Sequence, residues 1–258
     1  MKTRSELKRE AKDLLKGHWG KAIGLNILQI LPMLGVIFAV MLLLIVVMAL
    51  IASDPSEVAA DNFASQIDQV SGQGGGLRFF DNIFGSILTA LLATGVNFTL
   101  LDWLRTKNSD FKVVRGIFGV FTKRDFLPVV VLWIIQTVFE ALWSILFIIP
   151  GIIKSIAYSQ TYYIYKDIAD NGGDDDLNYL DYVTKSRQMM KGHKAEYFVL
   201  QLSFIGWNIL AIITLGIGYI WLIPYQNATY TAYYKSLAES QAEPVAPEAG
   251  QDDGYFEE

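Results

Sequence analysis

The chain has no cysteine, only two histidines and few charged residues. Without cysteine it forms no disulfide, no thiolate metal site and no cysteine nucleophile. Two histidines without an obvious third ligand make a poor metal site. The sequence also lacks a glycine-rich phosphate loop, a His-Glu-x-x-His motif and a nucleophile elbow. We therefore expect no catalytic residues, no metal and no cofactor, and the sequence favours a protein that is not an enzyme.

Charge is scarce because the chain is unusually apolar. Charged residues make up 18% of the 258 residues, whereas soluble domains carry about 25%. Apolar residues make up 52%, and residues 35–52 contain no polar side chain. A helix needs about 20 apolar residues to cross a bilayer. The composition therefore predicts an integral membrane protein rather than a soluble or nucleic-acid-binding protein.

Run length and helix breakers predict six membrane spans, at about residues 22–52, 79–104, 126–149, 151–165, 195–215 and 217–234. Turns at Pro150–Gly151 and Gly216–Gly218 would join spans three to four and five to six. The predicted fold class is all-α: a polytopic membrane helical bundle with six transmembrane helices in three hairpin-like units with cytoplasmic amphipathic helices. Residues 1–21 would form one such amphipathic helix, residues 22–238 the membrane domain, and residues 239–258 a disordered acidic cytoplasmic tail.

Lysine and arginine are concentrated on one predicted side of the membrane. Seven precede the first span, six lie between the second and third, five follow the fourth and one follows the sixth. Only Arg78 and Lys154 depart from this pattern. Because basic residues in short loops resist translocation, both termini should be cytoplasmic. The expected partners are membrane lipids with anionic headgroups or another membrane protein.

A five-residue motif occurs twice, as Leu14 to His18 and as Met189 to His193. Both copies join a basic amphipathic segment to an apolar span, and a weaker third copy covers residues 111–124. Basic amphipathic helices commonly lie in the plane of the lipid headgroups. The sequence therefore predicts an internal repeat of three units, each a cytoplasmic surface helix followed by two spans.

The repeated motif allows two interpretations. Its glycine is typical of a helix C-cap, with the following histidine near the helix dipole and the headgroups. Alternatively, the two copies meet and bind a lipid phosphate or another anion through Lys16, His18, Lys191 and His193. Both interpretations remain open from the sequence alone.

Glu140 lies in the third predicted span, about 15 Å from the outer turn at 1.5 Å per helical residue. An ionisable group at that depth is costly unless it is protonated, paired or hydrated. Folding the hairpin places Thr161 opposite it, with Tyr158 and Tyr162 nearby. Hydroxyl groups holding a protonated Glu140 would be structural, whereas Glu140 in a polar cavity would serve proton or cation transport.

Three stretches carry a family resemblance: residues 149–158, residues 186–193 and residues 215–225. They resemble the bacterial integral membrane proteins of the domain of unknown function 975 family, over most of the chain from Arg4 to Leu237. The layout is also similar to the membrane domain found beside some glycerophosphodiester phosphodiesterases. The resemblance implies a six-span protein of the bacterial plasma membrane, without a known activity or catalytic residues.

Three functions follow as hypotheses. The leading one is a non-enzymatic protein of the bacterial cell envelope that engages anionic lipid or a membrane partner through basic cytoplasmic surface helices. The second is a small-molecule or ion transporter that uses Glu140. The third is a lipid-modifying enzyme, which ranks last because no nucleophile with a base is evident.

Overall fold

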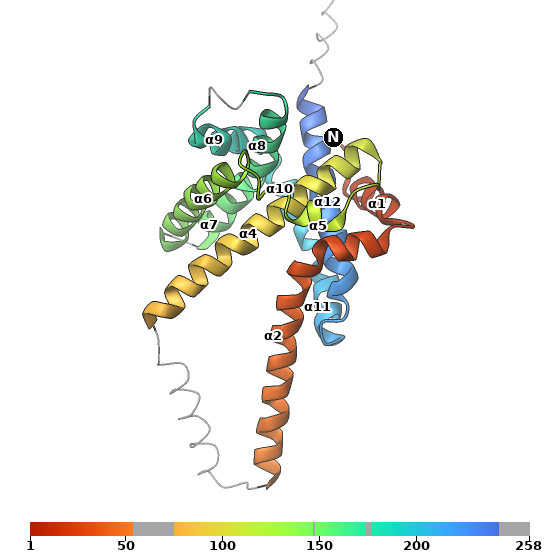
Figure 1. The fold of residues 1–258 in the computed structure, drawn as a ribbon, viewed down its shortest axis with the longest axis vertical. Coiled ribbons are helices and arrows are strands. Elements are labelled where there is room, and N and C mark those ends of the chain that lie inside the picture. Colours follow the sequence, from red (N-terminus) through yellow and green to blue (C-terminus); the bar gives the residue numbers. More distant parts are fainter. Residues whose placement is uncertain (54–74, 147, 174–176, 243–258) are drawn as a thin grey trace, which may run out of the picture.

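The computed structural model describes residues 1–53, 75–146, 148–173 and 177–242 (Figure 1). All regular structure in these ranges is α-helical, as predicted. In chain order the helices are α1 (Arg4–Leu15), α2 (Trp19–Ser53), α4 (Gly75–Thr106), α5 (Val113–Ile117), α6 (Phe126–Leu146), α7 (Ile148–Tyr158), α8 (Thr161–Asp170), α9 (Tyr179–Met189), α10 (Lys194–Leu202), α11 (Ile205–Ile213) and α12 (Tyr219–Ala242). The predicted acidic tail begins within α12, and its residues 243–258 lie outside the described ranges.

The helices pack in a cyclic order. Each short amphipathic helix packs on the helix that precedes it, α5 on α4 and α9 on α8, and the first of them, α1, packs on the last helix, α12. The helix after each amphipathic helix packs on an earlier helix of the previous unit or, for α2, on the last helix: α6 packs on α4, α10 on α7 and α2 on α12. The N-terminal helix therefore closes the bundle against the C-terminal helix.

Helices α4 and α12 contribute to both hydrophobic cores, and α8 packs beside them in one of the two. Helix α12 packs along α4, and Tyr163 of α8 stacks on Tyr234 of α12 with ring centroids 4.8 Å apart. The Tyr163 hydroxyl also lies 3.0 Å from that of Thr231 on α12. These buried rings satisfy their hydroxyls within the protein, which is the condition for burying tyrosine without a large penalty.

Three stretches of described residues are long and apolar enough to cross a membrane: Phe84–Thr106, Phe126–Trp143 and Lys194–Ile213. They correspond to the second, third and fifth predicted spans. The fourth predicted span is divided into α7 and α8 by a turn at Ser159 and Gln160, and α12 is rich in tyrosine, threonine and amides. Helix α2 contains the first predicted span, but many of its side chains lie outside the described residues.

One of the two predicted turns is confirmed and the other is wrong. Between α11 and α12, Leu215 and Gly216 adopt φ of 55° and 85°, the left-handed conformation that ends a helix. The second predicted turn, at Pro150–Gly151, is wrong, because both residues lie within α7, which begins at Ile148. Proline fits the first turn of a helix, where its missing N–H has no intrahelical partner. The prediction treated this proline as a helix stop, but it lies in a helix start.

Candidate functional site

Helix α1 begins with a capping box. The Thr3 hydroxyl accepts a hydrogen bond from the backbone N–H of Glu6, and the Glu6 carboxylate accepts one from the backbone N–H of Thr3. The predicted apolar face is present, since Leu7, Ala11 and Leu15 are all buried. That face packs on α12 rather than on lipid. Helix α1 is therefore part of the bundle, and only its polar sides remain available for binding.

One polar side of α1 is neutralised by an ion-pair hub around Glu10. Its carboxylate lies 2.7 Å from the Lys2 ammonium, 3.0 Å from that of Lys235 on α12 and 3.6 Å from that of Lys107 after α4. Burial alone would raise the pKa of Glu10, but the hydrogen bonds from Lys2 and Lys235 lower it overall. This hub fastens α1 to both the start and the end of the chain.

The opposite side of α1 borders a cleft of about 600 Å³. Its walls come from α1, α11 and α12, together with Trp19, the first residue of α2. No acidic residue lines it. Lys8 donates a hydrogen bond to the Ser203 carbonyl at 3.3 Å, and its ammonium lies 4.3 Å from the Phe204 ring centroid. The Lys12 ammonium lies 5.7 Å from the ring of Tyr225. Burial, with repulsion from neighbouring cations, lowers the pKa of Lys8.

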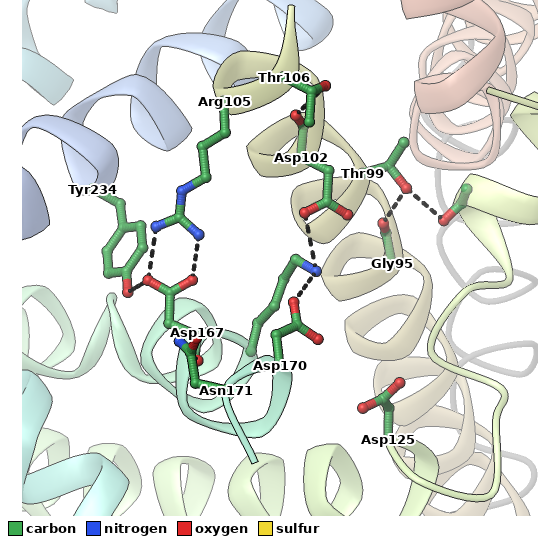
Figure 2. A network of polar contacts seen from close by, with 12 residues as sticks. Gly95, Thr99, Asp102, Arg105, Thr106, Asp125, Asp167, Asp170, Asn171 and Tyr234 are labelled. Atoms are coloured by element: carbon green, nitrogen blue, oxygen red, sulfur yellow. Dashed lines mark hydrogen bonds and ion pairs between the residues drawn. The ribbon is translucent and has the colours of Figure 1, made fainter. Parts of the chain in front are cut away.

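A second polar cluster joins α4, α8 and α12 (Figure 2). Arg105 of α4 binds the Asp167 carboxylate of α8 through two hydrogen bonds of 2.6 and 2.8 Å, and the Tyr234 hydroxyl of α12 donates to the same carboxylate. Nearby, the Lys166 ammonium lies 3.1 Å from Asp102 and 2.8 Å from Asp170. Because each of these charges has an opposite partner, the cluster holds α4, α8 and α12 together.

The same cluster extends to the segment before α6. Arg124 binds the Asp170 carboxylate at 2.9 Å and Asp125 at 2.8 Å, and the Tyr165 hydroxyl donates to Asp125. A cavity of about 630 Å³ lies beside these groups, lined by side chains of both charges. Burial raises the pKa of Asp170, but the hydrogen bonds from Lys166 and Arg124 lower it overall. Because Arg124 and Lys166 are already paired with carboxylates, this cluster stabilises the helix packing and leaves neither cation open to a bound anion.

Both copies of the repeated motif end a helix, but α1 ends at the second motif residue, Leu15, and α9 at the first, Met189. Gly17 directly follows the cap residue of α1 and adopts φ of 80°, which confirms the C-cap interpretation for that copy. Gly192 adopts φ of 87° but lies two residues after Met190, the cap residue of α9. The histidine that follows each glycine donates its backbone N–H three residues back, from His18 to Leu15 and from His193 to Met190. In both copies, the next helix begins directly after the histidine.

The side chains of the two motifs contact different helices. The His18 ring lies edge-on to Trp103 of α4, with centroids 5.9 Å apart. His193 lies 3.1 Å from Glu196 of α10 through its Nδ1, and its carbonyl accepts a hydrogen bond from Tyr233. Lys16 and Lys191 are both exposed. No contact between the two motifs is recorded in the described part of the chain, so their shared anion site stays a prediction.

Glu140 is half-buried on α6, and Tyr162 lies within electrostatic reach of its carboxylate. The Thr161 hydroxyl, predicted to hold a protonated Glu140, donates instead to the Tyr158 carbonyl at 2.7 Å. That carbonyl also accepts a hydrogen bond from Gln136 of α6. Within the described residues no hydrogen bond to the Glu140 side chain is recorded, and its role stays a prediction.

Sequence reasoning missed the cleft beside α1. Lys8 and Lys12 are four residues apart, a spacing that places both on one side of a helix, and this was the available signal. Their aromatic neighbours Phe204 and Tyr225 lie about two hundred residues away in the chain. Only the packing of α1 against α12 and against the segment before α11 brings these groups together.

The family described as "Protein of unknown function (DUF975)" matches residues 1–172 and residues 145–241. These two segments together cover most of the chain. The likeness to the membrane domain of glycerophosphodiester phosphodiesterases receives no support from this match. No curated protein and no solved structure matches the chain.

Proposed function

Because the chain belongs to the DUF975 family, we propose that it is a six-span, non-enzymatic integral membrane protein of the bacterial cell envelope. In this proposal both termini are cytoplasmic, and the cytoplasmic face engages anionic lipid. The family brings no activity, so the argument depends on how charge and apolar surface are distributed over the molecule.

Exposed apolar side chains support a membrane location. They are concentrated on the outward sides of α2, α6 and α11, and the largest include Phe38, Met48, Leu127, Leu142, Ile212 and Ile213. Soluble monomers rarely expose contiguous apolar surface on this scale. The three candidate crossings contain two of these helices, α6 and α11. Lipid contact explains why these side chains have no protein partner.

The remaining crossings are supported by helix pairing. Helix α7 packs against α6, and α12 packs against α11, as the return helices of hairpins would. Polar groups on α12 have partners inside the protein, since the Asn227 amide donates to Asn26 at 2.6 Å and to Gln29 at 3.0 Å on α2. Amides paired in this way can lie at membrane depth without contacting lipid. With α2 and α4, these hairpins supply six crossings.

The observation that carries the lipid role is that most carboxylates have ion-pair or hydrogen-bond partners, whereas many cations have no ion pair. Most carboxylates of the described cytoplasmic segments have partners, as Glu10, Asp167 and Asp170 do. Many cations there have no ion pair among the described residues, and they include Lys16, Lys112, Arg115, Lys123, Lys185 and Lys191. Each lysine or arginine near an anionic bilayer contributes about 1 kcal/mol of attraction. An anionic leaflet is therefore the partner that this face fits.

The topology can be tested without background because the chain has no cysteine. Asn108→Cys introduces a thiol between α4 and α5, and Ile217→Cys introduces one between α11 and α12. In intact cells, a membrane-impermeant maleimide should label Ile217→Cys but not Asn108→Cys. Permeabilised cells should give labelling of both. The reverse pattern in intact cells would refute the orientation.

The lipid role is tested on the purified protein in detergent. Native mass spectrometry should show tighter binding of phosphatidylglycerol than of phosphatidylcholine, and the preference should weaken with salt. Replacing Lys16, His18, Lys191 and His193 together with glutamine tests the predicted anion site at the two motifs. An unchanged preference in that variant eliminates the motif site, and equal binding of the two lipids by the native protein refutes the lipid role.

A transporter is the second candidate. It is supported by Glu140, an acidic residue in one of the candidate crossings. The Glu140 carboxylate lies within electrostatic range of Tyr162 and has no recorded hydrogen bond within the described ranges. An unpaired acid at membrane depth is a functional candidate by default. The Discussion gives the substitution that separates this role from a structural one.

A further inference from the structure

The cleft between α1, α11 and α12 has one charged end and one apolar end. Its charged end is formed by Lys8, Arg9 and Lys12 of α1. Its apolar end is formed mainly by tryptophan, leucine and alanine side chains of α11 and α12. Its volume of about 600 Å³ lies within the ~300–1,000 Å³ range of pockets that bind small molecules. The cleft is therefore large enough for a ligand and amphipathic along its length.

The positive charge at the α1 end is not neutralised by the protein. Lys8 and Lys12 form no ion pair with any described residue, and the recorded close partners of Lys8 are a carbonyl and an aromatic ring. Glu10, the acid nearest to them in sequence that forms ion pairs, is already occupied by three other lysines. Lys8 is partly buried and Lys12 is exposed, and two neighbouring ammonium groups without a counter-charge favour binding of an anion.

Arg9 contributes less to this argument. It lines the cleft, but it also lines a second cavity on the other side of α1. Glu6, Glu10 and Asp13 line that second cavity, and the positive charge of Arg9 attracts the Glu6 carboxylate. The unbalanced charge of the cleft therefore belongs mainly to Lys8 and Lys12.

The apolar end of the cleft adjoins the lipid-facing side of α11. Trp207 and Leu210 line the cleft while remaining 55% and 50% exposed, and α11 ends one of the candidate crossings. Gly218 keeps α12 close to α11, because a Cβ there would lie 2.8 Å from the Cα of Ala211. An acyl chain can therefore lie along α11 and continue into the bilayer without leaving an apolar environment.

We propose that this cleft binds an anionic phospholipid of the cytoplasmic leaflet, with its phosphate between Lys8 and Lys12 and an acyl chain along α11 and α12. The proposal rests on the proposed function, because it needs the cytoplasmic face at the membrane. It goes further by naming one site and one class of ligand. A soluble anion would use the charged end alone, whereas a phospholipid uses both ends.

The charged end is tested with the double variant Lys8→Gln and Lys12→Gln in the full-length protein. Phosphatidylglycerol binding should weaken about thirtyfold, from about 1 kcal/mol per lysine at 1.4 kcal/mol per tenfold. Lys2→Gln with Lys107→Gln is the matched control, because both lysines are exposed, both are already paired with Glu10 and neither lines the cleft. It removes the same charge and should change binding less than threefold. Circular dichroism of all variants verifies that they are folded.

Four outcomes would overturn the proposed lipid site in the cleft. Equal losses in the two double variants would mean diffuse attraction to the cationic surface, and an unchanged Lys8 and Lys12 variant would mean that the lipid binds elsewhere. Both of these leave the proposed function intact, since the native protein still prefers the anionic lipid. Competition by millimolar inorganic phosphate would indicate a soluble anion as the ligand. Equal binding of phosphatidylglycerol and phosphatidylcholine by the native protein would refute both proposals.

The apolar end has its own matched pair of variants. Leu210→Trp places a bulky indole ring in the cleft, whereas Ile209→Trp adds the same ring at a neighbouring position of α11 that does not line the cleft. The two native side chains have similar exposed fractions, 50% and 53%. Leu210→Trp should weaken phosphatidylglycerol binding at least fivefold, and Ile209→Trp should leave it within twofold. Equal effects would mean that no acyl chain occupies the cleft.

Discussion

Neutralising Glu10 should loosen α1 from the bundle. Its carboxylate is the common partner of Lys2, Lys107 and Lys235, which come from three different parts of the chain. In Glu10→Gln these cations lose their shared counter-charge. Lys235 is affected most, because its side chain is only 13% exposed and its other acidic partner, Glu239, lies 3.7 Å away.

The magnitude follows from the exposure of each pair. A hydrogen bond between charged groups contributes about 1.5–3 kcal/mol, and an exposed ion pair about 0–1 kcal/mol. The well-shielded pair with Lys235 should lie at the lower end of the first range. The pairs with Lys2 and Lys107 belong to the second, since these lysine side chains are 39% and 57% exposed. Because glutamine retains one hydrogen-bond acceptor, we expect a net loss of about 2 kcal/mol.

Hydrogen exchange of the α1 amides measures this loss directly. When exchange is limited by local opening, 2 kcal/mol corresponds to about thirtyfold faster exchange. Asp13→Asn is the control, since Asp13 lies on the same helix and has no ion pair within the described ranges. It should change exchange of α1 less than threefold. The reasoning fails if Glu10→Gln leaves the α1 amides as protected as in the native protein, or if both variants accelerate exchange equally.

Three further substitutions test other parts of the molecule. Gly95→Ala would place a Cβ against the Ile117 carbonyl oxygen, so it should destabilise the protein by at least about 1–3 kcal/mol, whereas Gly85→Ala on the same helix meets nothing within 4 Å; thermal unfolding compares the two. The lowered pKa of Asp170 means that its ion pairs stabilise the fold above the ordinary carboxyl pKa of about 3.9 and are lost as the pH falls through the lower folded-state value. Asp170→Asn should therefore be less stable at neutral pH and lose less stability on acidification, and a parallel decline with the native protein in pH-dependent melting would contradict this. Glu140→Gln should abolish a pH-dependent flux in proteoliposomes if Glu140 couples transport, whereas unchanged flux and folding would exclude that role.

Element type was predictable from the sequence because it depends on local spacing. The apolar stripe of α1, with Leu7, Ala11 and Leu15, repeats at the helical period, and these residues are buried. The glycines of the two repeated motifs were likewise predicted as C-caps; both adopt positive φ, and Gly17 directly follows the cap residue of α1. Pro150 shows the limit of local rules, because the same residue suits both the end and the start of a helix.

The amino-acid sequence by itself determined that the chain is helical, rich in apolar segments and cationic in several of the segments between them, because composition and periodicity require no knowledge of neighbours. The tertiary structure decided what each face contacts. It buried the apolar side of α1 against α12, gave Glu10 its three lysines and left Lys8 and Lys12 beside aromatic rings of distant helices. The physical reason is that a side chain's partner is set by how helices pack over long sequence separations, which the spacing of residues along one helix does not encode.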